Sequence, residues 1–104
     1  ELDLYSLVSN ALNNAIDAVS KLPEGERFIS LSAKCTNGML MLHVENPFCG
    51  SLTMEDGLPR SPRDERYHGF GMKSMKRIAE KYDGTLSVQS ENGIFGLDVL
   101  LLKP

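Results

Sequence analysis

An Asn-Gly pair at residues 37–38 separates two stretches in which apolar and polar residues alternate. Both central positions of a type I′ turn need a positive φ angle, so this dipeptide predicts a tight β-hairpin. One face of the hairpin carries Ile29, Leu31, Ala33, Cys35, Leu40, Leu42, Val44 and Asn46. We therefore expect a half-buried strand on each side of the turn.

Two segments have the periodicity of amphipathic helices. Residues 3–20 place their apolar side chains on one arc of a 3.6-residue helix, which ends before Pro23-Glu24-Gly25. The second helix is expected from about Phe70 to Tyr82, with Asp83-Gly84 as its C-terminal stop.

The chain ends in two further predicted strands. They cover residues 85–89 and 94–102 and are joined around Asn92-Gly93. Helix, two strands, loop, helix, two strands is the order of an α+β two-layer sandwich. Its helices would pack on one face of a mixed, mainly antiparallel sheet.

Composition sets broad limits. The 104 residues, 41% of them hydrophobic, fit a single compact domain. A net charge of -3 gives no reason to expect nucleic acid or anionic membrane as the main partner. The chain opens inside a polar-apolar pattern, so we expect residues 1–104 to be one domain excised from a longer protein. Cys35 and Cys49 are expected to be reduced thiols of a cytosolic domain.

The alternation disappears between Pro47 and His68, where Gly, Pro, Ser and charged residues dominate. This predicts a loop of about 20 residues, and loops of that length are usually functional lids or disordered segments. We place the lid at about residues 49–67.

A polar stripe runs along the first helix. Asn10, Asn14 and Asp17 are spaced i, i+4, i+7 and so share one side, next to the apolar arc. Amide and carboxylate oxygens at the edge of a cleft suit Mg²⁺, which prefers oxygen ligands and keeps several waters. A solvated polar face is the alternative.

Asn46 is a polar residue on the predicted buried face, at the end of its strand and before Pro47. A buried amide needs a hydrogen-bond partner, and the edge of an adenine ring offers both a donor and acceptors. Capping of the turn into the loop is the alternative, because asparagine is a favoured turn residue.

A Gly-x-Gly motif at Gly69 and Gly71 lies where the loop meets the second helix. Glycine allows close approach of the backbone, and a helix N-terminus favours an anion. Lys73 could add a positive charge. An ordinary loop-to-helix transition explains the motif equally well, and it lacks the full dinucleotide-binding pattern.

The polar helix stripe, the polar strand end, the long loop and the glycine-rich helix start follow one another along the chain. In this order they resemble the motifs of the GHKL superfamily, which includes gyrase-type ATPases, heat-shock chaperones, MutL proteins and histidine kinases. The resemblance is closest to the peptide-pheromone and citrate-type sensor kinases. Residues 7–18 (LVSNALNNAIDA) look like the N box, and residues 68–75 (HGFGMKSM) look like the G2 box. Residues 44–48 are similar to this subfamily's first glycine box, and Tyr82 to Thr85 with Phe95 look like its closing segment.

The resemblance implies a Bergerat-type ATP-binding fold with ATP and Mg²⁺ as cofactors. It implies that Asn14 coordinates Mg²⁺, that Asn10 lies beside the triphosphate, and that Asn46 meets the adenine amino group. Asn10 and Asn14 would be the catalytic residues. The implied ATP-binding set is Asn10, Asn14, Asp17, Asn46, His68, Gly69, Phe70, Gly71, Met72 and Lys73.

Three departures from the family pattern stand out. Asn46 occupies a position where most kinases have aspartate, so the adenine contact is expected to be uncharged or bridged by water. Pro62 replaces a lysine that could bind phosphate, which leaves Arg60, Arg63 or Arg66 as candidates in the lid. The lid also lacks DxGxG, so that glycine box is degenerate.

ATP hydrolysers of the superfamily carry a glutamate base at the position of Asn10, and an amide is not a usable base. This favours a two-component sensor histidine kinase. It would transfer the γ-phosphoryl group to a histidine on a separate dimerisation domain, and a response regulator would follow. The full-length kinase is expected to be dimeric and membrane-anchored, with this domain in the cytoplasm. The alternatives are an anti-sigma-factor type serine/threonine kinase and a degenerate, non-catalytic interaction module.

Overall fold

In the computed structural model, the described residues are 2–48, 53–55, 58–60 and 65–102, with side chains described for 3–48 and 71–102. The elements are α1 (Leu2–Val19), a short 3₁₀ turn (Glu24–Glu26), β1 (Ser30–Thr36), β2 (Met39–Pro47), β3 (Thr53–Glu55), β4 (Leu58–Arg60), α2 (Glu65–Lys81), β5 (Thr85–Glu91) and β6 (Ile94–Leu101). No helix in this part of the chain combines the length and apolar character that a membrane span requires.

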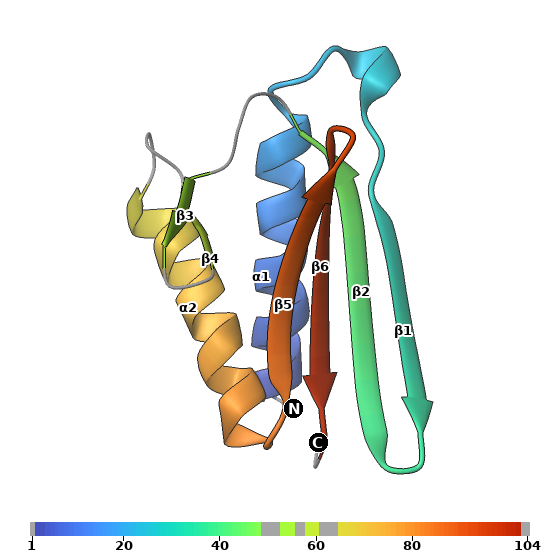
Figure 1. The fold of residues 1–104 in the computed structure, drawn as a ribbon, viewed down its shortest axis with the longest axis vertical. Helices are drawn as coiled ribbons and strands as arrows, with labels where there is room; N and C mark the ends of the chain where they lie inside the picture. Colours follow the sequence, from blue (N-terminus) through green and yellow to red (C-terminus); the bar gives the residue numbers. More distant parts are fainter. Residues whose placement is uncertain (1, 49–52, 56–57, 61–64, 103–104) are drawn as a thin grey trace.

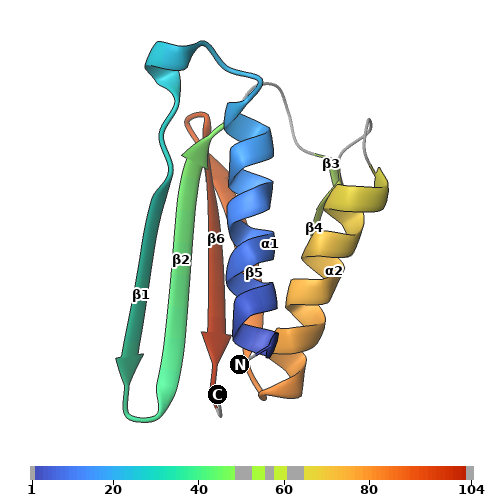
Figure 2. The same ribbon diagram turned by 180° about the vertical axis from the view of Figure 1, so that it is seen from behind.

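Four strands form one sheet in the order β1-β2-β6-β5, and β3 pairs with β4 in a separate ribbon (Figure 1). Each pairing in the four-stranded sheet is antiparallel. Both long helices pack on the same face of this sheet (Figure 2). The predicted α+β two-layer sandwich is therefore confirmed, although the expected mixed sheet has no parallel pair among the described strands.

Both Asn-Gly pairs form the turns of hairpins. Asn37 and Gly38 have φ angles of 50° and 77°, and Asn92 and Gly93 have φ angles of 53° and 78°. Two consecutive residues with positive φ are the mark of a type I′ turn, whose twist matches that of the flanking strands. The hairpin predicted at residues 37–38 is thus confirmed, and the second hairpin uses the same chemistry.

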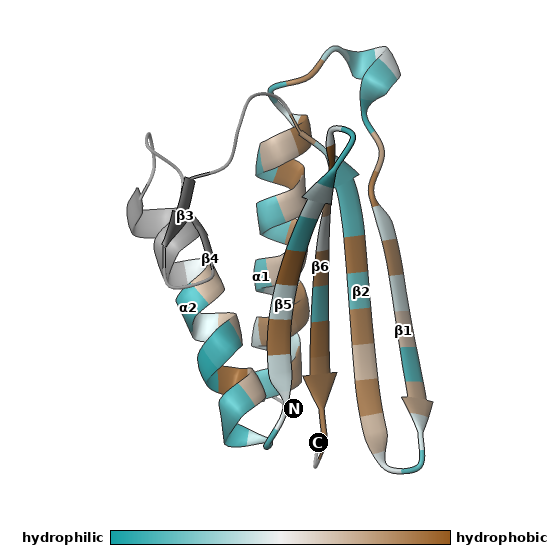
Figure 3. Ribbon diagram, in the orientation of Figure 1, coloured by the Kyte–Doolittle hydropathy of each residue, from teal (hydrophilic) through white to brown (hydrophobic). Residues whose placement is uncertain are grey.

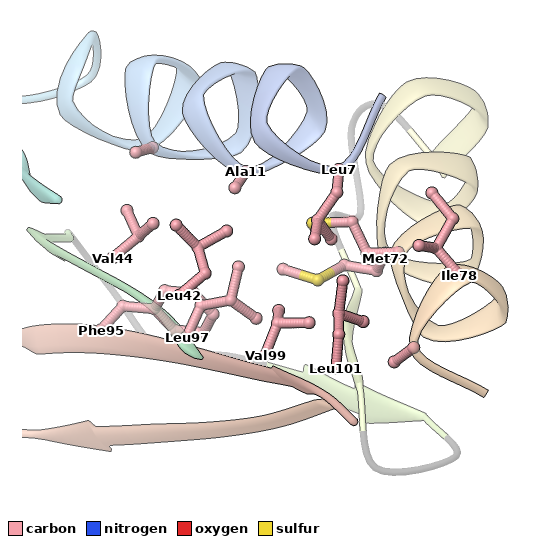
Figure 4. Packing of buried hydrophobic residues seen from close by; sticks show 13 residues of the cluster. Leu7, Ala11, Leu42, Val44, Met72, Ile78, Phe95, Leu97, Val99 and Leu101 are labelled. Carbon is pink, nitrogen blue, oxygen red and sulfur yellow. The ribbon is translucent and has the colours of Figure 1, made fainter. Parts of the chain in front are cut away.

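The core lies between the helices and the two central strands. Buried side chains alternate with less buried ones along β2 from Met41 and along β6 from Leu97, so one face of each strand joins the core. Figure 3 shows that hydrophobic residues make up much of both strands. The side chains of this cluster, shown in Figure 4, are those of Leu7, Ala11, Ala15, Leu42, Val44, Met72, Met75, Ile78, Ala79, Phe95, Leu97, Val99 and Leu101. The helices are thereby fixed over β2, β6 and β5.

The prediction that the first strand is half-buried is wrong. Every residue of β1 is exposed, including Leu31 at 42%. The reason is the position of β1 at the edge of the sheet, on the side away from both helices (Figure 2). Alternation predicts a strand with an apolar face, but it does not say whether another element covers that face.

The second helix and the long loop also differ from expectation. α2 begins at Glu65 instead of Phe70, so Gly69 and Gly71 lie inside the helix and not at its first turn. The segment predicted as a loop contains β3 and β4. The acidic pair Asp64-Glu65 favours a helix start, because carboxylates interact well with free N–H groups and the helix dipole.

The end of α2 agrees with the predicted stop. The Gly84 N–H donates to the Ala79 carbonyl (2.7 Å), the Asp83 N–H donates to the Glu80 carbonyl (3.1 Å), and Asp83 has a φ of 57°. These bonds are those of a Schellman motif, in which a residue of left-handed conformation ends the helix. The chain then turns directly into β5.

Candidate nucleotide site

The polar stripe of α1 lies beside the core and not within it. The core side of the helix buries Leu7, Ala11, Ala15 and Val19. Asn10, Asn14 and Asp17 are half-buried, as expected for a stripe that borders the apolar arc. The side of α1 that carries this stripe also meets α2, as the position of Asn10 shows.

Asn10 brings the two helices together at the predicted site. A Cβ atom built on Gly71 would lie 3.6 Å from Oδ1 of Asn10, an ordinary contact distance. The N-box and G2-box segments, far apart in sequence, therefore meet at this point. Because residue 71 is glycine, no side chain stands between the α2 backbone and this half-buried amide oxygen.

Asn46 is the one buried polar side chain among the described residues, with 1% of its surface exposed. It lies near the end of β2, opposite Phe95 of β6. Its Nδ2 donates to the Pro47 carbonyl at 2.9 Å, whereas Oδ1 has no hydrogen-bond partner among the described residues. The bond to a carbonyl fixes the orientation of the amide, because only the NH₂ end can donate.

An unpaired buried oxygen of this kind costs about 1–3 kcal/mol, so it calls for an explanation. The end of β2, the second half of α1 and the first half of α2 lie at the same end of the molecule (Figure 1). The Asn46 oxygen is therefore an unused acceptor at the end of the fold that holds the other predicted site residues.

The remaining predicted residues are placed as follows. Met72 packs in the core with 1% exposure, and Lys73 is exposed. His68, Gly69 and Phe70 lie in α2, Arg66 lies in its first turn and Arg60 ends β4, but their side chains are outside the described set. Arg63 and much of the predicted lid, residues 49–67, also lie outside the described residues.

Sequence reasoning missed Ser6. Nδ2 of Asn10 donates to the Ser6 hydroxyl at 3.3 Å, one helical turn earlier. Ser6 therefore extends the polar stripe to four residues, spaced i, i+4, i+8, i+11. The i, i+4 relation to Asn10 is a signal that could have found it.

The outer face of the sheet carries a second polar cluster. His43 contacts Asp98 through Nδ1 (2.5 Å) and Glu45 through Nε2 (2.8 Å), and Nε2 of Gln89 donates to Asp98 at 3.1 Å. Hydrogen bonds to the Glu45 and Asp98 carboxylates raise the pKa of His43 above its usual value.

The same face has an open hollow of about 350 Å³, which His43 and Asp98 help to line. It lies on the opposite side of the sheet from Asn46, because side chains alternate between faces along β2. Both ring nitrogens of His43 already have partners, so the cluster holds three strands together. Among the described side chains, no group of three or more His, Cys, Asp or Glu is arranged to hold a metal ion.

Comparison with known proteins decides the family. A family model described as GHKL domain matches residues 1–102. The chain belongs to the GHKL domain family. This confirms the resemblance drawn from the N-box and G2-box segments.

The structure of Acinetobacter baumannii histidine kinase AdeS is similar to that of this GHKL domain. The TM-score is 0.64 at 13% sequence identity, and the match covers 96% of this chain but 45% of the AdeS chain. The likeness shows a shared fold over nearly the whole chain, which corresponds to less than half of AdeS. Among curated protein sequences, none matches at a significant level.

Proposed function

We propose that this GHKL domain binds Mg-ATP and is the catalytic domain of a two-component sensor histidine kinase. The observation that carries the proposal is the Asn46 amide oxygen, which is buried, fixed in orientation and without a partner. Family membership and the fold shared with a histidine kinase agree with this function.

The Asn46 oxygen suits the amino group of adenine. It can only accept a hydrogen bond, and the exocyclic amine of adenine is a donor. Guanine presents a carbonyl oxygen at the same position, which would face Oδ1 without a shared proton. A bond to adenine would remove the cost of the unpaired oxygen, and the neutral amide makes this contact without burying a charge.

Asn10, Asn14 and Asp17 would serve the triphosphate end. Their oxygens on one side of α1 fit the ligand preference of Mg²⁺, with Asn14 as the metal ligand. When bound, Mg²⁺ would neutralise charge on the β- and γ-phosphates. Because residue 71 carries no side chain, a phosphate would be able to approach the α2 backbone beside Asn10. Lys73 and an arginine of the lid are the cationic candidates.

The residues of the domain favour phosphoryl transfer to a partner over hydrolysis. The Asn10 amide cannot accept a proton from water, so no general base stands at that position. His43 lies on the opposite face of the sheet and is held by two carboxylates. The acceptor would therefore be a histidine on a separate dimerisation domain, and a response regulator would receive the phosphoryl group next. The parent kinase would be a dimer anchored in the membrane, with this domain in the cytoplasm.

The test of this site compares Asn14 with its neighbour Asn13. Asn13 is exposed and lies about 100° around the helix from Asn14, so it is a matched control. Asn14→Ala is expected to lower the affinity for Mg-ATP at least about tenfold, which corresponds to the loss of a charge-assisted contact. Asn13→Ala is expected to leave the affinity unchanged. Calorimetric titration measures both, and equal affinities for all three proteins would contradict the assignment.

The kinase step is tested with radiolabelled Mg-ATP. The domain alone is expected to bind nucleotide without forming a stable phosphoprotein. Addition of the phosphoacceptor domain is expected to give an acid-labile, base-stable phosphohistidine. Stoichiometric self-labelling of the domain, or rapid ATP turnover, would show that the division of roles is wrong.

A further inference from the structure

The imidazole ring of His43 lies between two carboxylates on the outer face of the sheet. Nδ1 contacts Oδ1 of Asp98 at 2.5 Å, and Nε2 contacts Oε1 of Glu45 at 2.8 Å. An ionised carboxylate only accepts hydrogen bonds, so each ring nitrogen needs its own proton to bond its partner. The two contacts therefore fit an imidazolium ring. A neutral ring has one N–H group and can keep only one of them.

The two carboxylates differ in how they are held. The second oxygen of Asp98, Oδ2, accepts from Nε2 of Gln89 at 3.1 Å. Gln89 extends over Gly96 of β6, where a Cβ atom would lie 2.7 Å from Nε2. The Glu45 carboxylate, in contrast, has His43 as its only partner among the described residues. Loss of one contact to the ring therefore leaves Asp98 with a partner and Glu45 with water.

Few other charges face the ring. On β1, Ser32 is the register partner of His43 and is uncharged, while Lys34 is a cation on the same face. On β5, the side chains on this face near the ring are the uncharged Ser87 and Gln89. Both long helices pack on the opposite face (Figure 2). A lysine on this face favours loss of the proton, whereas the two carboxylates contact the ring directly and favour its retention.

We propose that His43 and Glu45 form a pH-sensitive latch on the outer face of the sheet. Protonated His43 holds Glu45 on one side and Asp98 on the other. When the Nε2 proton leaves to solvent, Nδ1 keeps its hydrogen bond to Asp98. The Glu45 carboxylate then faces a nitrogen lone pair and turns away to water. The outer face thereby loses one positive charge and presents a free carboxylate. The latch is on the opposite face of the sheet from Asn46, so it does not rest on the proposed function.

The latch makes the stability of the domain depend on pH. Hydrogen bonds to Glu45 and then to Asp98 raise the pKa of His43 in the folded state. The resulting stabilisation is fully present below the unfolded-state pKa of histidine, about 6.5, and is lost as pH rises through the higher folded-state pKa. The difference in urea midpoint between the wild type and His43→Gln should therefore be largest at about pH 6 and should shrink as the pH rises.

The latch itself is tested by nitrogen NMR of the histidine rings during a pH titration, with His43→Gln to assign the signals. Both ring nitrogens of His43 should be protonated at neutral pH. As the pH rises, Nε2 should lose its proton at a midpoint above the usual pKa of histidine, while Nδ1 keeps its proton. The side-chain carboxyl signal of Glu45 should shift with the same midpoint.

Glu45→Gln is the informative variant, because glutamine keeps the shape of the side chain and its NH₂ group can donate to an unprotonated Nε2. The midpoint of His43 should therefore fall. Ser32→Ala is the matched control, because Ser32 pairs with His43 across β1 and β2 but does not titrate. Its midpoint should equal that of the wild type.

Three results would overturn the latch. The first is a wild-type midpoint at or below the usual pKa of histidine, and the second is a midpoint that does not change in Glu45→Gln. The third is loss of the proton from Nδ1 instead of Nε2, because Asp98 would then be the carboxylate that is released. The first and third are measured on the wild type and need no variant. All three can be read whether or not the domain binds nucleotide, so the latch and the proposed function can fail separately.

Discussion

Gly71 lies in the first half of α2 and Gly84 follows the end of the same helix, and their surroundings differ. A Cβ atom at Gly71 would meet Oδ1 of Asn10 at an ordinary contact distance of 3.6 Å. A Cβ atom at Gly84 would lie 1.6 Å from the carbonyl oxygen of Leu100, a distance that no packing allows. A side chain at residue 84 would therefore overlap the backbone of β6, whereas a Cβ atom at residue 71 would make an ordinary contact.

Two polar groups of the fold, one beside the end of α2 and one near the end of β2, also differ. Near Gly84, Oδ2 of Asp3 accepts from Nζ of Lys81 and from the Tyr82 hydroxyl, each at 2.7 Å, which ties α1 to α2. Near the end of β2, Oδ1 of Asn46 is buried without a partner among the described residues. The Asp3 carboxylate has hydrogen-bond partners within the chain, whereas the buried Asn46 oxygen has none among the described residues. This difference separates residues that stabilise the fold from residues available to a ligand.

The largest effect is expected from Gly84→Ala. The methyl group would overlap the backbone of β6, and a backbone atom cannot move aside as a flexible side chain can. We expect a loss of at least about 3 kcal/mol in the free energy of unfolding, at the upper end of what overpacking costs. Urea denaturation followed by circular dichroism measures it.

Gly71→Ala is the matched control for this change. Alanine is favoured over glycine inside a helix by about 0.5–1 kcal/mol, so the fold should be as stable as the wild type or slightly more stable. The affinity for Mg-ATP should fall, because the methyl group would stand between the α2 backbone and the Asn10 oxygen. If Gly71→Ala destabilises the domain as much as Gly84→Ala, the contrast between the two positions is wrong.

The next effect is expected at Asn46, where stability and binding should change in opposite directions. Asn46→Val removes the unpaired oxygen and introduces a residue that suits a buried strand. The free energy of unfolding should be unchanged or higher by up to about 1 kcal/mol, while ATP affinity falls at least about tenfold.

Base preference gives a second measurement on the same variant. The wild type should prefer ATP to GTP, since Oδ1 accepts from an amine but not from a carbonyl oxygen. Asn46→Val should lose that preference. A variant that is less stable yet still selects ATP would show that the Asn46 oxygen serves the fold and not the ligand.

The smallest effect is expected at Asp3. Hydrogen bonds from Lys81 and then Tyr82 lower the pKa of Asp3 below its usual value. The carboxylate therefore stabilises the fold above the unfolded-state pKa, and this contribution is lost as pH falls through the lower folded-state pKa. Asp3→Asn should be slightly less stable than the wild type at neutral pH, and this difference should be smaller at an acidic pH near the lowered folded-state pKa, where the Asp3 carboxylate begins to protonate. Denaturation at the two pH values measures this, and ATP affinity should not change.

Features set within a few residues could be predicted from the sequence. Asn37-Gly38 specified its turn because positive φ angles are a local property of those residues. The periodicity of residues 3–20 gave α1 to within one residue at each end. The start of α2 was placed too late from the sequence, because Gly69 and Gly71 obscured the helix-start signal at Asp64-Glu65. The exposure of β1 was missed because that exposure depends on where the two helices pack on the sheet.

The candidate site divides in the same way. Residue types and spacing were enough to select Asn10, Asn46 and Gly71 and to indicate the GHKL family, because periodicity and backbone preference act along the chain. Only the tertiary structure decided that the Asn10 oxygen faces Gly71, that Ser6 contacts the other end of that amide, and that the Asn46 oxygen is buried without a partner among the described residues. Burial and hydrogen-bond pairing depend on which distant segments the core brings together, and that information is not local to any stretch of sequence.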